Sequence, residues 1–155
     1  MTGRIDARLA ELGITLPDGI PPIGSYVPYV VTGDLVVIAG QGPARDGKYA
    51  IFGQVGTETS IEEAIEAARL CFINMLSHLK SACGGNLDRV QQVVRLGGFI
   101  FSGADFNQHA QIMNGASDLA LAVFGNAGRH ARTTVGASGL PMGISVEIEG
   151  LFRIA

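Results

Sequence analysis

The residues with the clearest chemical potential lie in the last quarter of the chain. Arg132 belongs to a short apolar run, and Glu147 and Glu149 belong to a second run that follows a turn rich in glycine. Residues two apart on a strand point to the same face, so the two carboxylates should share one face and need water, a partner or a ligand. We read the two runs as neighbouring strands, which makes Arg132 the natural counter-charge. Its planar fork also suits a small carboxylate, so the pattern indicates a site for a small anionic molecule.

The composition narrows the class of protein that could hold this site. With 155 residues, of which 47% are hydrophobic and 16% charged, the chain is expected to form one domain over residues 1–155. The apolar excess favours a large subunit interface, although an unusually apolar monomer surface would also explain it. The chain has a net charge of −3 and its basic residues are scattered, so it lacks the clustered positive charge of a nucleic-acid binder. No signal peptide or spanning segment is recognisable, so a cytoplasmic protein without membrane contact is expected.

The three histidines, His78, His109 and His130, share no metal-ligand spacing. Each is expected to be a surface or interface residue, with His78 at a polar position of a long helix, and the alternative for His130, which lies near Arg132 in the sequence, is a place at the fringe of a ligand cleft. The sequence therefore predicts neither a bound metal nor a cofactor.

Periodicity predicts the elements that would position these residues. Apolar residues alternate or recur at helical spacing in several segments, and the Ser60–Glu63 pattern is typical of a capping box that opens a long helix. The expected helices cover about 5–12, a long stretch that opens at the capping box and is stopped by Gly84–Gly85, and about 109–124. The expected strands cover about 26–31, 35–39, 89–101 and the runs around 132 and 147. This order predicts an α+β fold, with one mixed sheet covered on one face by two main helices, plus a short N-terminal helix.

Several motifs along the chain together carry a family resemblance. They are Ser25–Tyr26, Ala39–Gln41, Ser60–Glu63, Asp105–Phe106, Ala131–Arg132, Leu140–Pro141 and Val146–Glu149. With these motifs the chain resembles the RidA/YjgF/YER057c/UK114 superfamily, also known as L-PSP endoribonuclease-like proteins. It is most similar to the branch described as YjgF/chorismate-mutase-like putative endoribonucleases.

The resemblance implies a chorismate-mutase-like fold, assembled as a barrel-shaped homotrimer with ligand clefts between subunits. It also implies hydrolysis of reactive 2-imino or enamine acids, such as 2-aminoacrylate, to 2-keto acids and ammonia. In this frame Arg132 would hold the substrate carboxylate and Glu147 would position or activate the attacking water. Further lining positions would be Tyr26, Gly40, Thr134 and Asn114. Such a reaction needs only orientation and acid–base assistance, and no cofactor.

Other interpretations remain open from the sequence. Thr134 stands where many family members have cysteine and Ala39 where many have serine, which leaves the substrate preference open. Arg132 and Glu147 could be structural residues, with Glu149 an ion-pair or interface residue. A non-catalytic trimer that binds a small carboxylate is the main alternative function. The net negative charge of the chain argues against a third possible function, endoribonuclease activity.

Overall fold

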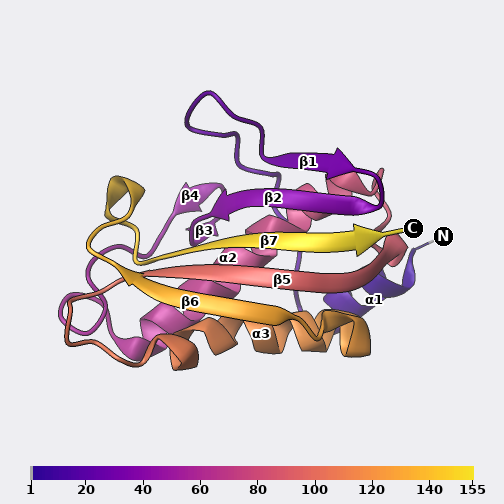
Figure 1. The fold of residues 1–155 in the computed structure, drawn as a ribbon. Coiled ribbons are helices and arrows are strands. Elements are labelled where there is room, and N and C mark those ends of the chain that lie inside the picture. The colour runs from indigo at the N-terminus through magenta and orange to yellow at the C-terminus, as the bar shows by residue number, and fades with distance from the viewer. Residues whose placement is uncertain (1) are drawn as a thin grey trace.

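The structure, a computed structural model, describes residues 2–155 and is built around one five-stranded sheet (Figure 1). The strands lie in the order β1-β2-β7-β5-β6. Their bounds are Tyr29–Thr32 (β1), Leu35–Gln41 (β2), Val90–Phe101 (β5), Ala131–Ala137 (β6) and Val146–Ile154 (β7). β5 and β6 are parallel, whereas the other neighbouring pairs are antiparallel. The sheet is therefore mixed, with β1 and β6 at its two edges.

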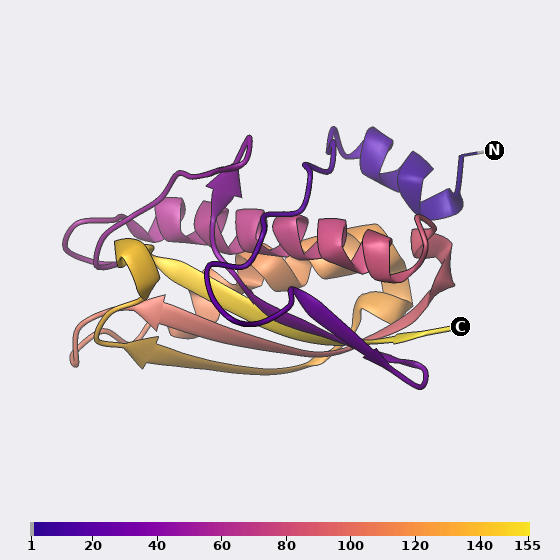
Figure 2. The ribbon, with the colours of Figure 1, turned by 90° about the horizontal axis from the view of Figure 1, so that it is seen from above.

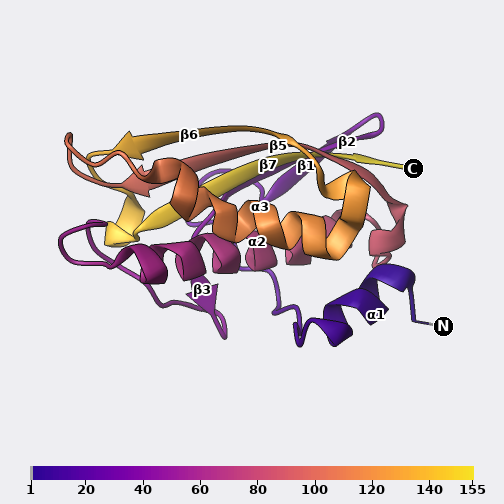
Figure 3. The same ribbon diagram turned by 90° about the horizontal axis from the view of Figure 1, so that it is seen from below.

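Two long helices cover one face of this sheet. These are α2 (Ile61–Ala82) and α3 (His109–Phe124), which run side by side, and the shorter α1 (Arg4–Glu11) lies near one end of the pair (Figure 3). A separate hairpin of β3 (Ala44–Arg45) and β4 (Lys48–Tyr49), and three 3-10 turns, η1 (Leu87–Arg89), η2 (Gly125–Gly128) and η3 (Pro141–Gly143), complete the described chain. None of its helices lies on the opposite face of the sheet (Figure 2). The predicted α+β fold with its helix-covered sheet is thus confirmed.

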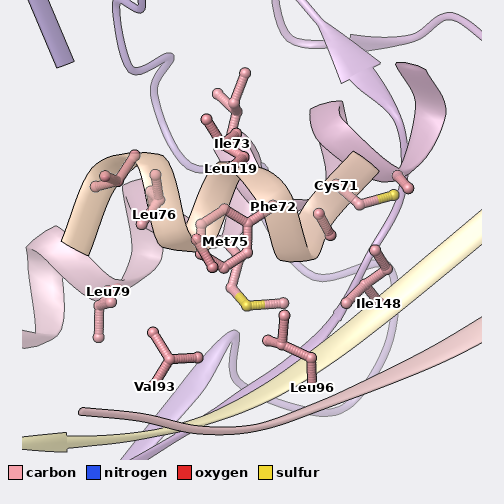
Figure 4. Close-up of a cluster of buried hydrophobic side chains, with 14 of the residues drawn as sticks. Cys71, Phe72, Ile73, Met75, Leu76, Leu79, Val93, Leu96, Leu119 and Ile148 are labelled. Atoms are coloured by element: carbon pink, nitrogen blue, oxygen red, sulfur yellow. The ribbon is translucent and has the colours of Figure 1, made fainter. Parts of the chain in front are cut away.

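Helix α2 begins where the sequence predicted, because its capping box is formed. The Ser60 hydroxyl accepts a hydrogen bond from the Glu63 amide at 3.1 Å, and the Glu63 carboxylate accepts one from the Ser60 amide at 2.8 Å. The apolar side of the helix then supplies the core, where Met75 approaches Val93 and Leu96 of β5 (Figure 4). These side chains are fully buried, so the sheet face toward α2 is closed to ligands.

Glycines set how closely the helices approach their neighbours. A Cβ atom at Gly115 in α3 would lie 2.1 Å from the carbonyl oxygen of Ile65 in α2, so the two helix backbones are almost in contact. A Cβ atom at Gly98 would lie 2.6 Å from the sulfur of Met113, so the Met113 side chain of α3 packs directly against the β5 backbone. The position of α3 relative to β6, and of the side chains between them, is thereby fixed.

The expectation that the Arg132 and Glu147 strands are neighbours was wrong. β5 lies between β6 and β7 and pairs with both. The connection from Ser138 to Ser145 is long enough to cross one strand, a distance of about 10 Å between the flanking strands. A loop of this length is compatible with either arrangement, so the sequence pattern could not distinguish them.

His78 is also placed differently from expectation. It is only 5% exposed on α2, because the segment that follows α1 crosses the helix at this point. A Cβ atom at Gly19 would lie 2.6 Å from the imidazole ring. His78 is therefore a buried residue beneath a connecting segment and not a polar surface residue.

Among residues 2–155, no helix is both long enough and apolar enough to span a bilayer.

Candidate functional site

The Arg132 side chain lies at the sheet edge and is held by α3. Its Nη1 donates to the Asn114 Oδ1 at 2.7 Å and to the Ser117 Oγ at 3.1 Å, and its Nη2 donates to the Ala110 carbonyl at 3.3 Å. All three acceptors belong to one helix, so the guanidinium plane is fixed relative to α3. Asn114, predicted to line the site, is brought directly to Arg132.

The hydrogen-bond count of Arg132 shows what it can still bind. A guanidinium has five N–H donors, and the three contacts with α3 engage both donors of Nη1 and one of Nη2. The Nε–H and one Nη2–H remain, and these two neighbouring donors match the two oxygens of a carboxylate. Within the described residues no Asp or Glu forms an ion pair with Arg132, so the expected pairing with Glu147 or Glu149 is not formed.

A solvent-open hollow of about 260 Å³ lies beside this guanidinium. It is lined by Ser117, Leu121, Arg129, His130 and Arg132. Arg129, like Arg132, forms no ion pair with any described carboxylate. The charge around the hollow is therefore suited to an anion.

Glu147 lies on the opposite, helix-free face of the sheet. It follows buried Val146 and precedes buried Ile148, both of which point to the core, so alternation turns Glu147 outward. Partial burial raises the pKa of its carboxyl, and the nearby Glu149 carboxylate raises it further. A carboxyl whose pKa is raised toward neutrality is better matched to proton transfer than an ordinary one.

Gly40 makes room for this carboxyl group. A Cβ atom at Gly40 would lie 2.8 Å from both Cδ and Oε1 of Glu147. The β2–β7 register shifts between Ile38 and Gln41, and this irregularity brings the Gly40 backbone against the acid. The structure therefore unites Gly40 with Glu147, two positions that the sequence had placed in one site.

Glu149 has a different environment from Glu147 although both share a face. Its Oε1 lies 3.1 Å from Nη1 of Arg95, with which it forms an ion pair. Gly97 lies beneath the pair, since a Cβ atom there would be 2.9 Å from Oε1 of Glu149. The prediction that Glu149 is an ion-pair residue is confirmed, and Glu147 is left as the acid without a cationic partner among the described residues.

Arg132 and Glu147 do not meet within one chain. Arg132 is paired with Leu96 of β5, whereas Glu147 is paired with Phe99. Their backbones are therefore separated by two strand spacings, about 10 Å, and by about 10 Å along the strands. Because the side chains also leave opposite faces of the sheet, a small ligand could touch both only if they came from different copies of the chain.

Tyrosines lie near the Glu147 end of the site. Burial raises the pKa of Tyr49 most, and the proximity of Tyr26 and then Glu147 raises it further. Tyr26 itself is 48% exposed, and its hydroxyl accepts a hydrogen bond from the Ile23 amide at 3.4 Å. Tyr49, which sequence reasoning missed, arrives here on the hairpin whose turn residues Asp46 and Gly47 have positive φ.

Thr134 lies on β6 two residues after Arg132 and points to the same, helix-covered face. Its Oγ1 is buried and has no hydrogen-bond partner among the described residues. Its methyl group lies against Gly98, as a Cβ atom there would be 3.3 Å from it. Thr134 is thus on the Arg132 side of the sheet, separate from Gly40 and Tyr26.

Across residues 2–155, no three His, Cys, Asp or Glu side chains are grouped in a way that could hold a metal ion.

The fold and this edge site place the protein in a known class, the chorismate-mutase-like α+β proteins. The chain belongs to the family described as YjgF/chorismate mutase-like, putative endoribonuclease, whose profile matches residues 6–151. It is 41% identical over 154 residues to protein TCP17 of Trypanosoma cruzi, covering 99% of this chain and 96% of that protein.

Solved structures from bacteria agree with this assignment. Atu1372 of Agrobacterium tumefaciens, a protein of unknown function, is 40% identical, has a TM-score of 0.91, and the match covers 97% of this chain and 92% of that one. A Shewanella oneidensis protein with the same endoribonuclease description is 33% identical, with a TM-score of 0.93 and coverage of 97% and 99%.

Proposed function

We propose that the protein hydrolyses small 2-imino or enamine acids to 2-keto acids and ammonia at clefts between its copies. The observation that carries this proposal is the guanidinium of Arg132, which is fixed by α3 while two adjacent donors remain for a carboxylate. The family resemblance supplies the reaction class. Asn114 supports the site by holding Arg132, and backbone groups at Thr134 and Gly40 would contact the imine end of the substrate.

The reaction needs one water, both of whose protons end on nitrogen. Water adds to the C=N carbon of the 2-imino acid, and Glu147 accepts one proton from that water as the C–O bond forms and returns it to nitrogen. The carboxylate then takes the proton of the new hydroxyl group and passes it to nitrogen, and ammonia leaves as the C–N bond breaks and the keto C=O bond forms. The raised pKa of Glu147 suits these steps, because it makes the carboxylate a stronger proton acceptor than that of an ordinary glutamate.

Arg132 and Glu147 leave opposite faces of the sheet, which supports an assembly in which one copy supplies Arg132 and its neighbour supplies Glu147. The helix-free face of the sheet also exposes apolar side chains, with Val30, Val37 and Val135 each close to half exposed. A ring of three copies would cover such a face and repeat the same cleft three times. Tyr26 and Tyr49 would then lie on the Glu147 side of each cleft.

A non-catalytic carboxylate-binding protein is the alternative that the same Arg132 geometry favours. Orientation of the carboxylate without proton transfer would give binding but no turnover. Endoribonuclease activity has less support, because the chain carries a net charge of −3 and its cationic hollow is small.

The test is ammonia release from 2-aminoacrylate generated in place, compared with the buffer rate. We expect Arg132→Ala to abolish the enzymatic increment, and Arg132→Lys to restore little of it because lysine lacks the two-pronged donor geometry. Arg45→Ala is a control for the loss of one arginine, since Arg45 lies on the β3 hairpin and pairs with Glu66 instead of with α3. Wild-type protein that binds pyruvate in calorimetry but releases no ammonia above buffer would replace the deaminase by the binding alternative.

A further inference from the structure

A chain of hydrogen bonds continues from Arg132 into the body of the protein. Arg132 Nη1 donates to Ser117 Oγ at 3.1 Å, and that oxygen lies 2.8 Å from Nε2 of His130. The other ring nitrogen of His130, Nδ1, lies 2.6 Å from the carbonyl oxygen of Gly128. Four residues are therefore linked in series, and Ser117 is only 9% exposed at the centre of the series.

For a neutral His130 ring, the chemistry of the end group fixes the direction of every bond. A carbonyl oxygen only accepts, so Nδ1 of His130 must carry a proton and donate to Gly128. In the neutral ring Nε2 is then an acceptor, and it receives the Ser117 hydroxyl proton. The Ser117 oxygen is thereby turned to accept from Arg132, and the series runs from Arg132 through Ser117 and His130 to Gly128.

The anchor of this series is rigid. Gly128 is buried, and a Cβ atom there would lie 2.2 Å from the carbonyl oxygen of Ala120, so the η2 backbone is held directly against α3. His130 thus connects the fixed carbonyl of Gly128 to Ser117, which accepts the hydrogen bond from Arg132. Asn114 and Ala110 hold the same guanidinium from α3 alone, without this second attachment.

We propose that His130 is a positioning residue, which sets the guanidinium of Arg132 for carboxylate binding by fixing the hydroxyl of Ser117 in one orientation. The proposal rests on the proposed function for the identity of the ligand, a small 2-oxo or 2-imino carboxylate. His130 touches Arg132 only through Ser117, so it acts on ligand affinity and on orientation but takes no part in proton transfer. It requires the Nδ1–H form of the ring.

A double-mutant cycle tests the route of this effect. We expect Ser117→Ala and His130→Ala each to weaken pyruvate binding, measured by calorimetry, by about 3- to 10-fold, the value of one oriented hydrogen bond. Because both act through one link, the Ser117→Ala/His130→Ala double variant should be no weaker than Ser117→Ala. Ser81→Ala is the control for serine loss, since the Ser81 hydroxyl donates to the Ser77 carbonyl within α2 and is no member of the Arg132 series.

Rescue by shape-matched residues separates positioning from bulk packing. Glutamine at position 130 can present an acceptor to Ser117, whereas phenylalanine fills a similar volume without one. His130→Gln should therefore recover most of the affinity that His130→Phe loses, with equal melting temperatures for the two. Multiplied losses in the double variant, or equal affinities for His130→Gln and His130→Phe, would overturn the proposal.

Nuclear magnetic resonance of the ligand-free protein tests the same idea without any substrate. The imidazole ¹⁵N shifts of His130 should report a protonated Nδ1 and an unprotonated Nε2, and the Arg132 Nε–H signal should become more mobile in both Ser117→Ala and His130→Ala. A ring protonated at Nε2 alone, or an unchanged Arg132 signal, would refute the positioning role. If wild-type protein binds no 2-keto acid while these signals behave as expected, the proposed function fails and the role of His130 in holding Arg132 stands.

Discussion

Mixing two inactive variants is expected to restore deaminase activity, because Arg132 and Glu147 lie on opposite faces of one sheet. Arg132→Ala removes two charge-assisted hydrogen bonds to the carboxylate, about 3–4 kcal/mol, and should lower kcat/KM by about 10²–10³-fold. Glu147→Gln removes the proton acceptor and should cost about 10²-fold. Each pure variant should therefore be nearly inactive.

The recovered fraction follows from the ring geometry. If each cleft takes Arg132 from one copy and Glu147 from the next, a mixed ring of three has a single boundary at which both native residues face one another. Mixed rings of either composition should thus regain about one third of wild-type activity. If both residues acted within one chain, no cleft would contain both and no activity would return.

The assay uses co-expression with two different affinity tags and purification through both tags, followed by ammonia release from 2-aminoacrylate. Light scattering confirms the number of copies in the purified assembly. Two differently tagged wild-type proteins, co-expressed and purified in the same way, show what tags and mixing alone do to activity. Mixed assemblies as inactive as their parents would refute the shared cleft.

Further outcomes follow from individual contacts. Gly40→Ala should displace the Glu147 carboxyl, whose Cδ lies 2.8 Å from the new Cβ, and lower kcat by at least about 10-fold while the melting temperature changes little. Glu149→Gln removes a charge that raises the pKa of Glu147, so the acid limb of the pH–rate profile should move to lower pH. Burial lowers the pKa of His78, so the unfolded chain binds its proton more readily, and urea unfolding should show stability lost as the pH falls below about 6.5, less so in His78→Gln. Gly115→Ala should cost about 3 kcal/mol of unfolding free energy, because the new methyl group meets the backbone of α2.

Controls for these variants come from the same chain. A Cβ atom at Gly139 would meet nothing within 4 Å, so Gly139→Ala should alter neither activity nor stability. An active Gly40→Ala protein, or an acid limb that stays in place in Glu149→Gln, would contradict the assigned surroundings of Glu147. Equal acid sensitivity of wild type and His78→Gln, or a Gly115→Ala protein as stable as wild type, would contradict the packing described for those positions.

The sequence predicted the elements well because their signals are local. The capping box at Ser60 and the helical spacing that follows it each depend on residues a few positions apart. Alternation likewise placed Glu147 and Glu149 on one face, as the structure shows. Such patterns need no knowledge of distant contacts.

The arrangement of the site could not be predicted in the same way because it depends on strand order. A loop of the observed length permits either a hairpin or a crossing over β5, and only the crossing separates Arg132 from Glu147. The true partner of Glu149 is Arg95, which lies 54 positions away and carries no local signal. Ser117 was missed for the same reason, since a serine within a helix has many ordinary roles.

Alternation along β7 has a consequence for how the gene tolerates change. Val146, Ile148 and Phe152 face the interior, whereas Glu147 and Glu149 face outward from the bare side of the sheet. Successive positions of this strand are therefore under different selection. Substitutions at the inward-facing positions change the yield of folded protein, whereas substitutions at the outward-facing positions change subunit association and turnover under the proposed assembly. A saturation scan scored separately for protein abundance and for growth under imine stress should show the two scores alternating with a period of two residues.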